Sequence, residues 1–165
     1  MVLLSAGMAH ADFLTRESIL KVQEQDIYHG IALAQIVRHE SFKALNSASE
    51  KQGHYMVNSD RHLLVKYRTT EGPSWVFTFR PEEISALRAM SQKSQLVYLC
   101  LVCGYETVCA LDFEEIKILL SPKAAEQQSI TVDAPPNASL RVRGTLGELD
   151  KTVPHNAFPK KIFFA

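Results

Sequence analysis

Residues 54–103 constrain the fold of this chain more than any other stretch, because strand-like runs alternate there with one helical segment. The three strand-like runs lie at 55–59, 62–69 and 75–80. Pro81, followed by two acidic residues, favours the start of a helix that we expect to reach residue 92. The nearly unbroken apolar run 96–103 is typical of a strand buried on both faces.

The sequence on both sides of this block predicts further elements. Two helices are expected upstream, over about 16–24 and from an Asp26 N-cap to Asn46, where apolar residues recur at helical spacing. Downstream we expect a strand at 107–111, a helix capped by Asp112, and short strands at 129–132 and 139–143. The apolar C-terminal residues are expected to dock onto the body: Phe158, Ile162, Phe163 and Phe164.

This order predicts an α+β fold, in which a helix is followed by three antiparallel strands, a second helix and a buried strand. We expect one mixed sheet flanked by helices. The length of 165 residues suits a single domain, with a core at 26–120 and a β-rich tail at 121–165 docking on it.

Composition limits the classes of partner and compartment. Lys plus Arg and Asp plus Glu both number 18, so nucleic acid would have to bind through a local patch rather than an overall basic field. No apolar stretch is long enough to cross a membrane, and the N-terminus lacks the basic residues of a signal peptide. We therefore expect a cytoplasmic protein without a membrane partner.

The three cysteines are Cys100, Cys103 and Cys109. Cys100 and Cys103 form a CxxC, but on a strand they point to opposite faces and lack a second ligand pair for zinc. We interpret all three as buried free thiols and predict no metal site and no cofactor.

Alternation along the strands places several polar residues on one possible sheet face. These residues are His54, Asn58, Lys66, Arg68, Thr78 and Arg80. Lys and Arg contact phosphate directly, so one hypothesis is an anion-binding surface formed by all of them except Thr78. The alternative is an outer sheet face that is simply solvated.

The order of elements over residues 26–103 resembles the common core of the PD-(D/E)XK nuclease superfamily. That resemblance implies carboxylates on the second and third strands that bind Mg²⁺, with a Lys two positions after the second carboxylate. Lys66 matches the lysine, and Asp60 and Glu40 are the candidate acids. However, the motif requires an acidic residue or Gln at position 64, where this chain has Leu64.

Two hypotheses about function follow. The first is a non-catalytic binding module with a nuclease-like core, which engages a protein or nucleic acid through a local patch. The second is a divergent Mg²⁺-dependent nuclease that uses Asp60, Lys66 and Glu40. The sequence leaves homo-oligomerisation open.

Overall fold

The computed structural model describes residues 21–51, 53–93 and 96–164. Most of the helix expected over 16–24, and the N-terminal segment considered as a signal peptide, lie outside these residues. Among the described residues, 21–23 are not helical, and no helix is both long and apolar enough to cross a bilayer.

Helix α2 spans Glu24–Val37 and is shorter than the sequence predicts. Asp26 does not precede this helix as its N-cap. It lies in the first turn, where its carboxylate accepts a hydrogen bond from the Gln23 N–H at 2.9 Å. The apolar spacing that continues past Val37 belongs instead to a turn and to a short strand, β1 (Leu45–Ser47).

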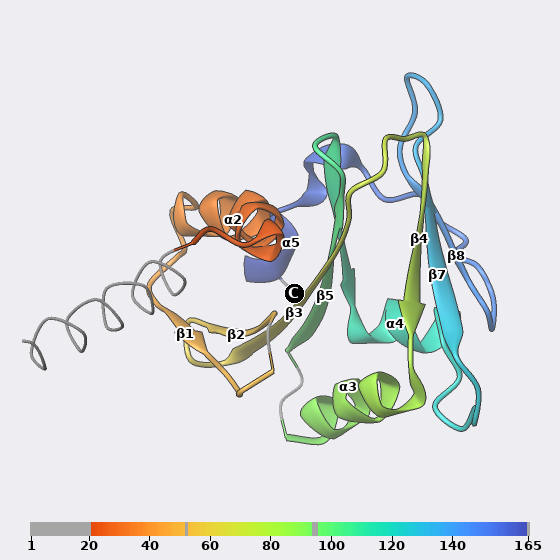
Figure 1. The fold of residues 1–165 in the computed structure, drawn as a ribbon, viewed down its shortest axis with the longest axis horizontal. Coiled ribbons are helices and arrows are strands. Elements are labelled where there is room, and N and C mark those ends of the chain that lie inside the picture. Colours follow the sequence, from red (N-terminus) through yellow and green to blue (C-terminus); the bar gives the residue numbers. More distant parts are fainter. Residues whose placement is uncertain (1–20, 52, 94–95, 165) are drawn as a thin grey trace, which may run out of the picture.

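A mixed five-stranded sheet, sheet A, forms the centre of the molecule (Figure 1). Its strands are ordered β1, β2 (His54–Val57), β3 (Arg61–Arg68), β5 (Val97–Cys103) and β6 (Thr107–Asp112). Strand β3 runs parallel to β5, and every other neighbouring pair is antiparallel. All seven residues of β5 are buried, as the apolar run predicts.

A second sheet, sheet B, contains β4 (Ser74–Phe79), β7 (Gln128–Asp133) and β8 (Arg141–Gly144). The strand expected at 75–80 therefore exists, but it pairs with β7 rather than with β3. The three neighbouring antiparallel strands of sheet A are instead β1, β2 and β3, and β1 comes from the segment predicted to be helical. Strand β4 joins the two β-strands of the tail because its buried face, Trp75, Phe77 and Phe79, packs with theirs.

The α+β fold class is confirmed, and sheet A separates two apolar cores. Helix α2 and the short helix α5 (Lys160–Phe163) cover one face of sheet A. Sheet B, α3 (Pro81–Lys93) and α4 (Phe113–Leu119) cover the other face (Figure 1). Helix α4 begins as predicted, since the Asp112 carboxylate accepts from the Glu115 N–H at 2.9 Å.

The C-terminal segment packs against the body, as expected for three of its four apolar residues. Phe158, Ile162 and Phe163 are buried beside α2 and sheet A, after a 3-10 turn at His155–Ala157. Phe164 remains 57% exposed, and its ring lies 5.8 Å from that of His39 between centroids.

Candidate functional site

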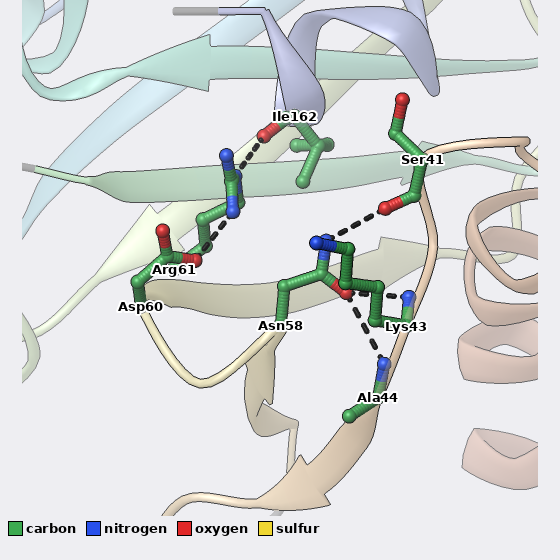
Figure 2. Close-up of polar contacts among 7 residues, drawn as sticks. All are labelled: Ser41, Lys43, Ala44, Asn58, Asp60, Arg61 and Ile162. Carbon is green, nitrogen blue, oxygen red and sulfur yellow. Dashed lines mark hydrogen bonds and ion pairs between the residues drawn. The ribbon is translucent and has the colours of Figure 1, made fainter.

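Asn58 occupies the turn between β2 and β3, and both the nitrogen and the oxygen of its side-chain amide form hydrogen bonds within the protein (Figure 2). Its Nδ2 donates to the Ser41 carbonyl at 2.8 Å. Its Oδ1 accepts from the backbone N–H groups of Lys43 at 2.7 Å and Ala44 at 3.2 Å. Its φ of 52° lies in the left-handed region that asparagine tolerates better than most residues. Asn58 therefore holds the 41–44 segment against the turn.

Asp60 lies in the same turn and pairs with the neighbouring Arg61 (Figure 2). The Nε of Arg61 donates to the Ile162 carbonyl at 2.9 Å, so this guanidinium also fastens the C-terminal segment to the start of β3. The local role of Asp60 is thus to orient a residue that links two distant parts of the chain.

Lys66 points from β3 toward the junction of α3 and β4. Its Nζ lies 2.8 Å from a Glu83 carboxylate oxygen and 2.5 Å from the Thr78 carbonyl oxygen. The ammonium also lies 4.4 Å from the centre of the Phe79 ring. Burial opposes ionisation of Glu83, but hydrogen bonds from the Arg80 N–H and from Lys66 lower its pKa overall. Lys66 therefore connects sheet A to sheet B, and Glu83 balances its positive charge.

The three residues of the nuclease hypothesis do not meet around one ion. Six positions along an extended chain place Asp60 and Lys66 about 20 Å apart. Glu40 lies in the exposed turn after α2 rather than on the helix. Across the described ranges, no three His, Cys, Asp or Glu side chains gather closely enough to hold a metal ion.

The residues of the proposed anion surface are also distributed differently from the sequence expectation. Arg80 lies 3.4 Å from a Glu82 oxygen and 3.6 Å from a Glu83 oxygen. Arg68 is exposed. Of the five residues in the anion-binding hypothesis, it is the one whose side chain has no polar partner among the described residues. Thr78 lies in β4 of sheet B and Arg80 directly follows that strand, whereas His54 and Lys66 lie in sheet A, so one continuous polar face does not form. An anion would have to compete with the internal partners of the other four residues.

Two cavities nevertheless adjoin each other in this region, and Lys66 lines one of them while His54 lines the other. We call the two cavities together the α2–β3 cleft. One cavity, of about 280 Å³, is lined by Gln25, His29, Leu64, Val65, Lys66, Tyr67 and Glu83. The other, of about 210 Å³, is lined by Gln25, Asp26, His29, Ser47, Ser49, Glu50, Lys51, Gly53, His54 and Tyr55. Gln25 and His29 are common to both cavities.

His29 is the most buried ionisable group of the cleft. Its Nδ1 lies 3.0 Å from the Tyr55 hydroxyl, and its ring meets the edge of Tyr67 at 5.8 Å between centroids. Burial lowers the pKa of His29, although the nearby Asp26 charge acts in the opposite direction. The imidazole is therefore held mainly neutral at pH 7, with a hydrogen-bonding role.

A pair of histidines, His54 and His62, lies beside the smaller cavity, which His54 lines. His54 Nε2 lies 3.0 Å from His62 Nδ1, and His54 Nδ1 lies 3.0 Å from the Ser49 hydroxyl. Burial, followed by the charges of His62 and Lys51, lowers the pKa of His54. Burial and then the charge of Lys93 lower the pKa of His62. This network holds Ser49 beside His54, and both residues line the smaller cavity of the cleft.

The cysteines lie in the cores, away from the cleft, and are free and buried, as the sequence predicts. Burial raises the pKa of the Cys109 thiol to about 12 and raises those of Cys100 and Cys103 as well. Thiolate chemistry is therefore suppressed at all three positions.

Sequence reasoning missed most residues of the cleft, among them Gln25, His29 and Glu83. Glu83 was visible only as an acidic residue in the first turn of a helix, a pattern that also occurs without any partner. No protein-family model matches this sequence, and searches of curated proteins and of solved structures find no match.

Proposed function

We propose that this protein is a non-catalytic binding module with a nuclease-like core, which holds a macromolecular partner in the α2–β3 cleft. The element order supports this proposal. Helix α2, strands β1 to β3, helix α3 and strand β5 follow the order of the PD-(D/E)XK core, and β4 is diverted to sheet B. The cleft lies along β2 and β3, the strands that bear the metal-binding acids in those enzymes.

The pairing of Lys66 with Glu83 is the observation on which the proposal rests. Leu64 stands two positions before Lys66, and the residue that pairs with Leu64 on strand β2 is His54. Neither side chain is a carboxylate, and the nearest acid, Glu83, is already bonded to Lys66 and to the Arg80 N–H. The cleft therefore offers hydrogen-bonding groups without a set of ligands for Mg²⁺.

The absence of catalysis is tested by incubating the protein with single-stranded and double-stranded DNA and RNA in Mg²⁺ or Mn²⁺. We expect no cleavage by the wild-type protein or by Lys66→Ala. Cleavage by the wild type that Lys66→Ala abolishes would reverse the proposal in favour of the nuclease hypothesis.

The role of the cleft is tested by filling it. Gln25 lines both cavities, so Gln25→Trp should block entry, whereas Glu24→Trp changes the adjacent exposed position outside them. Partners captured from a lysate should be retained by wild type and Glu24→Trp and lost with Gln25→Trp. Equal capture by all three proteins would place the binding surface elsewhere.

A further inference from the structure

Strand β2 is too short to cover the whole of β3, and this leaves part of a strand edge open inside the cleft. The pairing of β2 with β3 ends at His54 opposite Leu64. One more backbone link follows, from the Val65 N–H to the Gly53 carbonyl at 2.8 Å. Gly53 lies in a turn with a φ of 84°, so the chain does not continue along β3 beyond this point.

The direction of the backbone groups on β3 follows from its observed hydrogen bonds. The His62 N–H donates to the Leu96 carbonyl at 2.9 Å, and the Arg68 carbonyl accepts from the Gly104 N–H at 2.9 Å, so even-numbered residues face β5. Val65 faces the β2 side. Because these directions alternate along a strand, Tyr67 also faces the β2 side, where no described residue pairs with its backbone.

The open edge lies in the 280 Å³ cavity rather than on a flat surface. Gln25 and His29 of α2 form one wall, and Glu83 of α3, bonded to Lys66, forms another. An unpaired strand edge is a template for another extended chain. A peptide backbone supplies the alternating acceptor and donor that the Tyr67 N–H and C=O require, and its side chains alternate between the two walls.

We propose that the α2–β3 cleft binds an extended peptide segment, which pairs with the edge of β3 at Tyr67 and extends the line of β2. This inference rests on the proposed function and specifies the partner. A nucleic-acid strand fits the site less well, because Glu83 neutralises Lys66 and the two acids of the smaller cavity, Asp26 and Glu50, outnumber its one lysine, Lys51.

The open edge itself is tested by amide hydrogen exchange on the free protein. The Tyr67 amide should exchange on the order of 100-fold or more faster than those of its neighbours Lys66 and Arg68, which pair with β5. Equal protection of the three amides would overturn the inference, because the edge would then be closed.

Binding is tested with a library of short random linear peptides, selected on the wild-type protein and counter-selected on Gln25→Trp. A selected peptide should protect the Tyr67 amide, and N-methylation at alternate peptide positions should abolish binding while the intervening positions tolerate it. Tyr67→Pro removes the unpaired N–H and should weaken binding about 10-fold more than Tyr67→Ala, which keeps it.

The outcomes separate this inference from the proposed function. Peptides that bind wild type and Gln25→Trp equally, or without protecting Tyr67, would overturn the inference. If oligo-dT or oligo-U binds and Gln25→Trp abolishes that binding while no peptide is selected, the cleft is a nucleic-acid site and only the inference fails. If neither probe binds and lysate capture does not depend on the cleft, the proposed function fails as well.

Discussion

Asn58 shows how a polar residue that the sequence places on a binding surface instead serves the fold. Its side chain makes three hydrogen bonds to the 41–44 segment, and its backbone has a positive φ of 52°. The turn needs a residue that tolerates this conformation and that also offers both a donor and two acceptor sites. Asparagine meets both requirements, and aspartate lacks the donor.

We expect Asn58→Ala to lower the free energy of unfolding by about 2–3 kcal/mol, because it removes the three hydrogen bonds and adds left-handed strain. Asn58→Gly relieves the strain but not the lost bonds, so it should be about 1 kcal/mol less destabilising than the alanine variant. Urea unfolding followed by circular dichroism measures both. A loss below about 0.5 kcal/mol for alanine would contradict the structural role.

At the scale of elements, one ion pair connects β3, β4 and α3. The Lys66 side chain is 22% exposed. Its ammonium group contacts Glu83, the Thr78 carbonyl and the Phe79 ring. On the solvated sheet face that the sequence allows, an exposed Lys66 could be removed with little change in stability. The structure indicates a larger effect, because two partners would lose a charged donor.

A double-mutant cycle with Lys66→Met and Glu83→Gln tests this link. Each single change should cost about 1–2 kcal/mol of unfolding free energy, with a coupling of about 1 kcal/mol. The exposed pair Lys117 and Glu114, joined at 2.8 Å, is the matched control and should show a coupling below about 0.5 kcal/mol. Equal coupling in the two pairs would show that partial burial adds nothing at Lys66.

The C-terminal segment offers a second test at this scale. Ile162 is completely buried between α2 and sheet A, so Ile162→Ala should lower the unfolding free energy by about 2–4 kcal/mol. Phe164, two residues later, is 57% exposed, and Phe164→Ala should cost less than about 1 kcal/mol. Similar losses for the two variants in denaturant titrations would mean that the segment does not pack as described.

Elements specified by local sequence could be predicted, whereas those that depend on distant partners could not. The apolar run of β5, the Pro81 start of α3 and the Asp112 cap of α4 each carry their signal within a few residues. The sequence predicts a helix up to Asn46, which includes most of strand β1, because no Gly or Pro interrupts the apolar spacing after Val37. The partner of β4 could not be predicted, since alternation shows that one face is buried but not which sheet buries it.

The same limit applies to the candidate site. Lys66 and His54 could be singled out because strand alternation is a local pattern. The cleft itself depends on the end of β2 at His54 and on the approach of α2, which brings His29 beside Tyr67. Asp60 looked like a catalytic acid, but aspartate is also favoured in turns for its local hydrogen bonds.

For the whole molecule, three partly buried histidines make stability depend on pH. Burial is the largest cause that lowers the pKa values of His29, His54 and His62 below the ordinary 6.5. The unfolded chain therefore binds more protons than the folded protein as the pH falls through about 6.5. Stability is then greatest above this value and is lost on acidification.

We expect the unfolding free energy to fall between pH 7.5 and pH 5.5, and the decrease to be smaller in a His54→Gln/His62→Gln variant. Glu83 does not contribute in this window, because its lowered pKa lies below 4.5 and its effect is lost only in more acidic solution. Urea titrations at a series of pH values measure the slope. Stability that rises on acidification, or an unchanged slope in the double variant, would mean that the folded protein accommodates protonated histidines as readily as the unfolded chain.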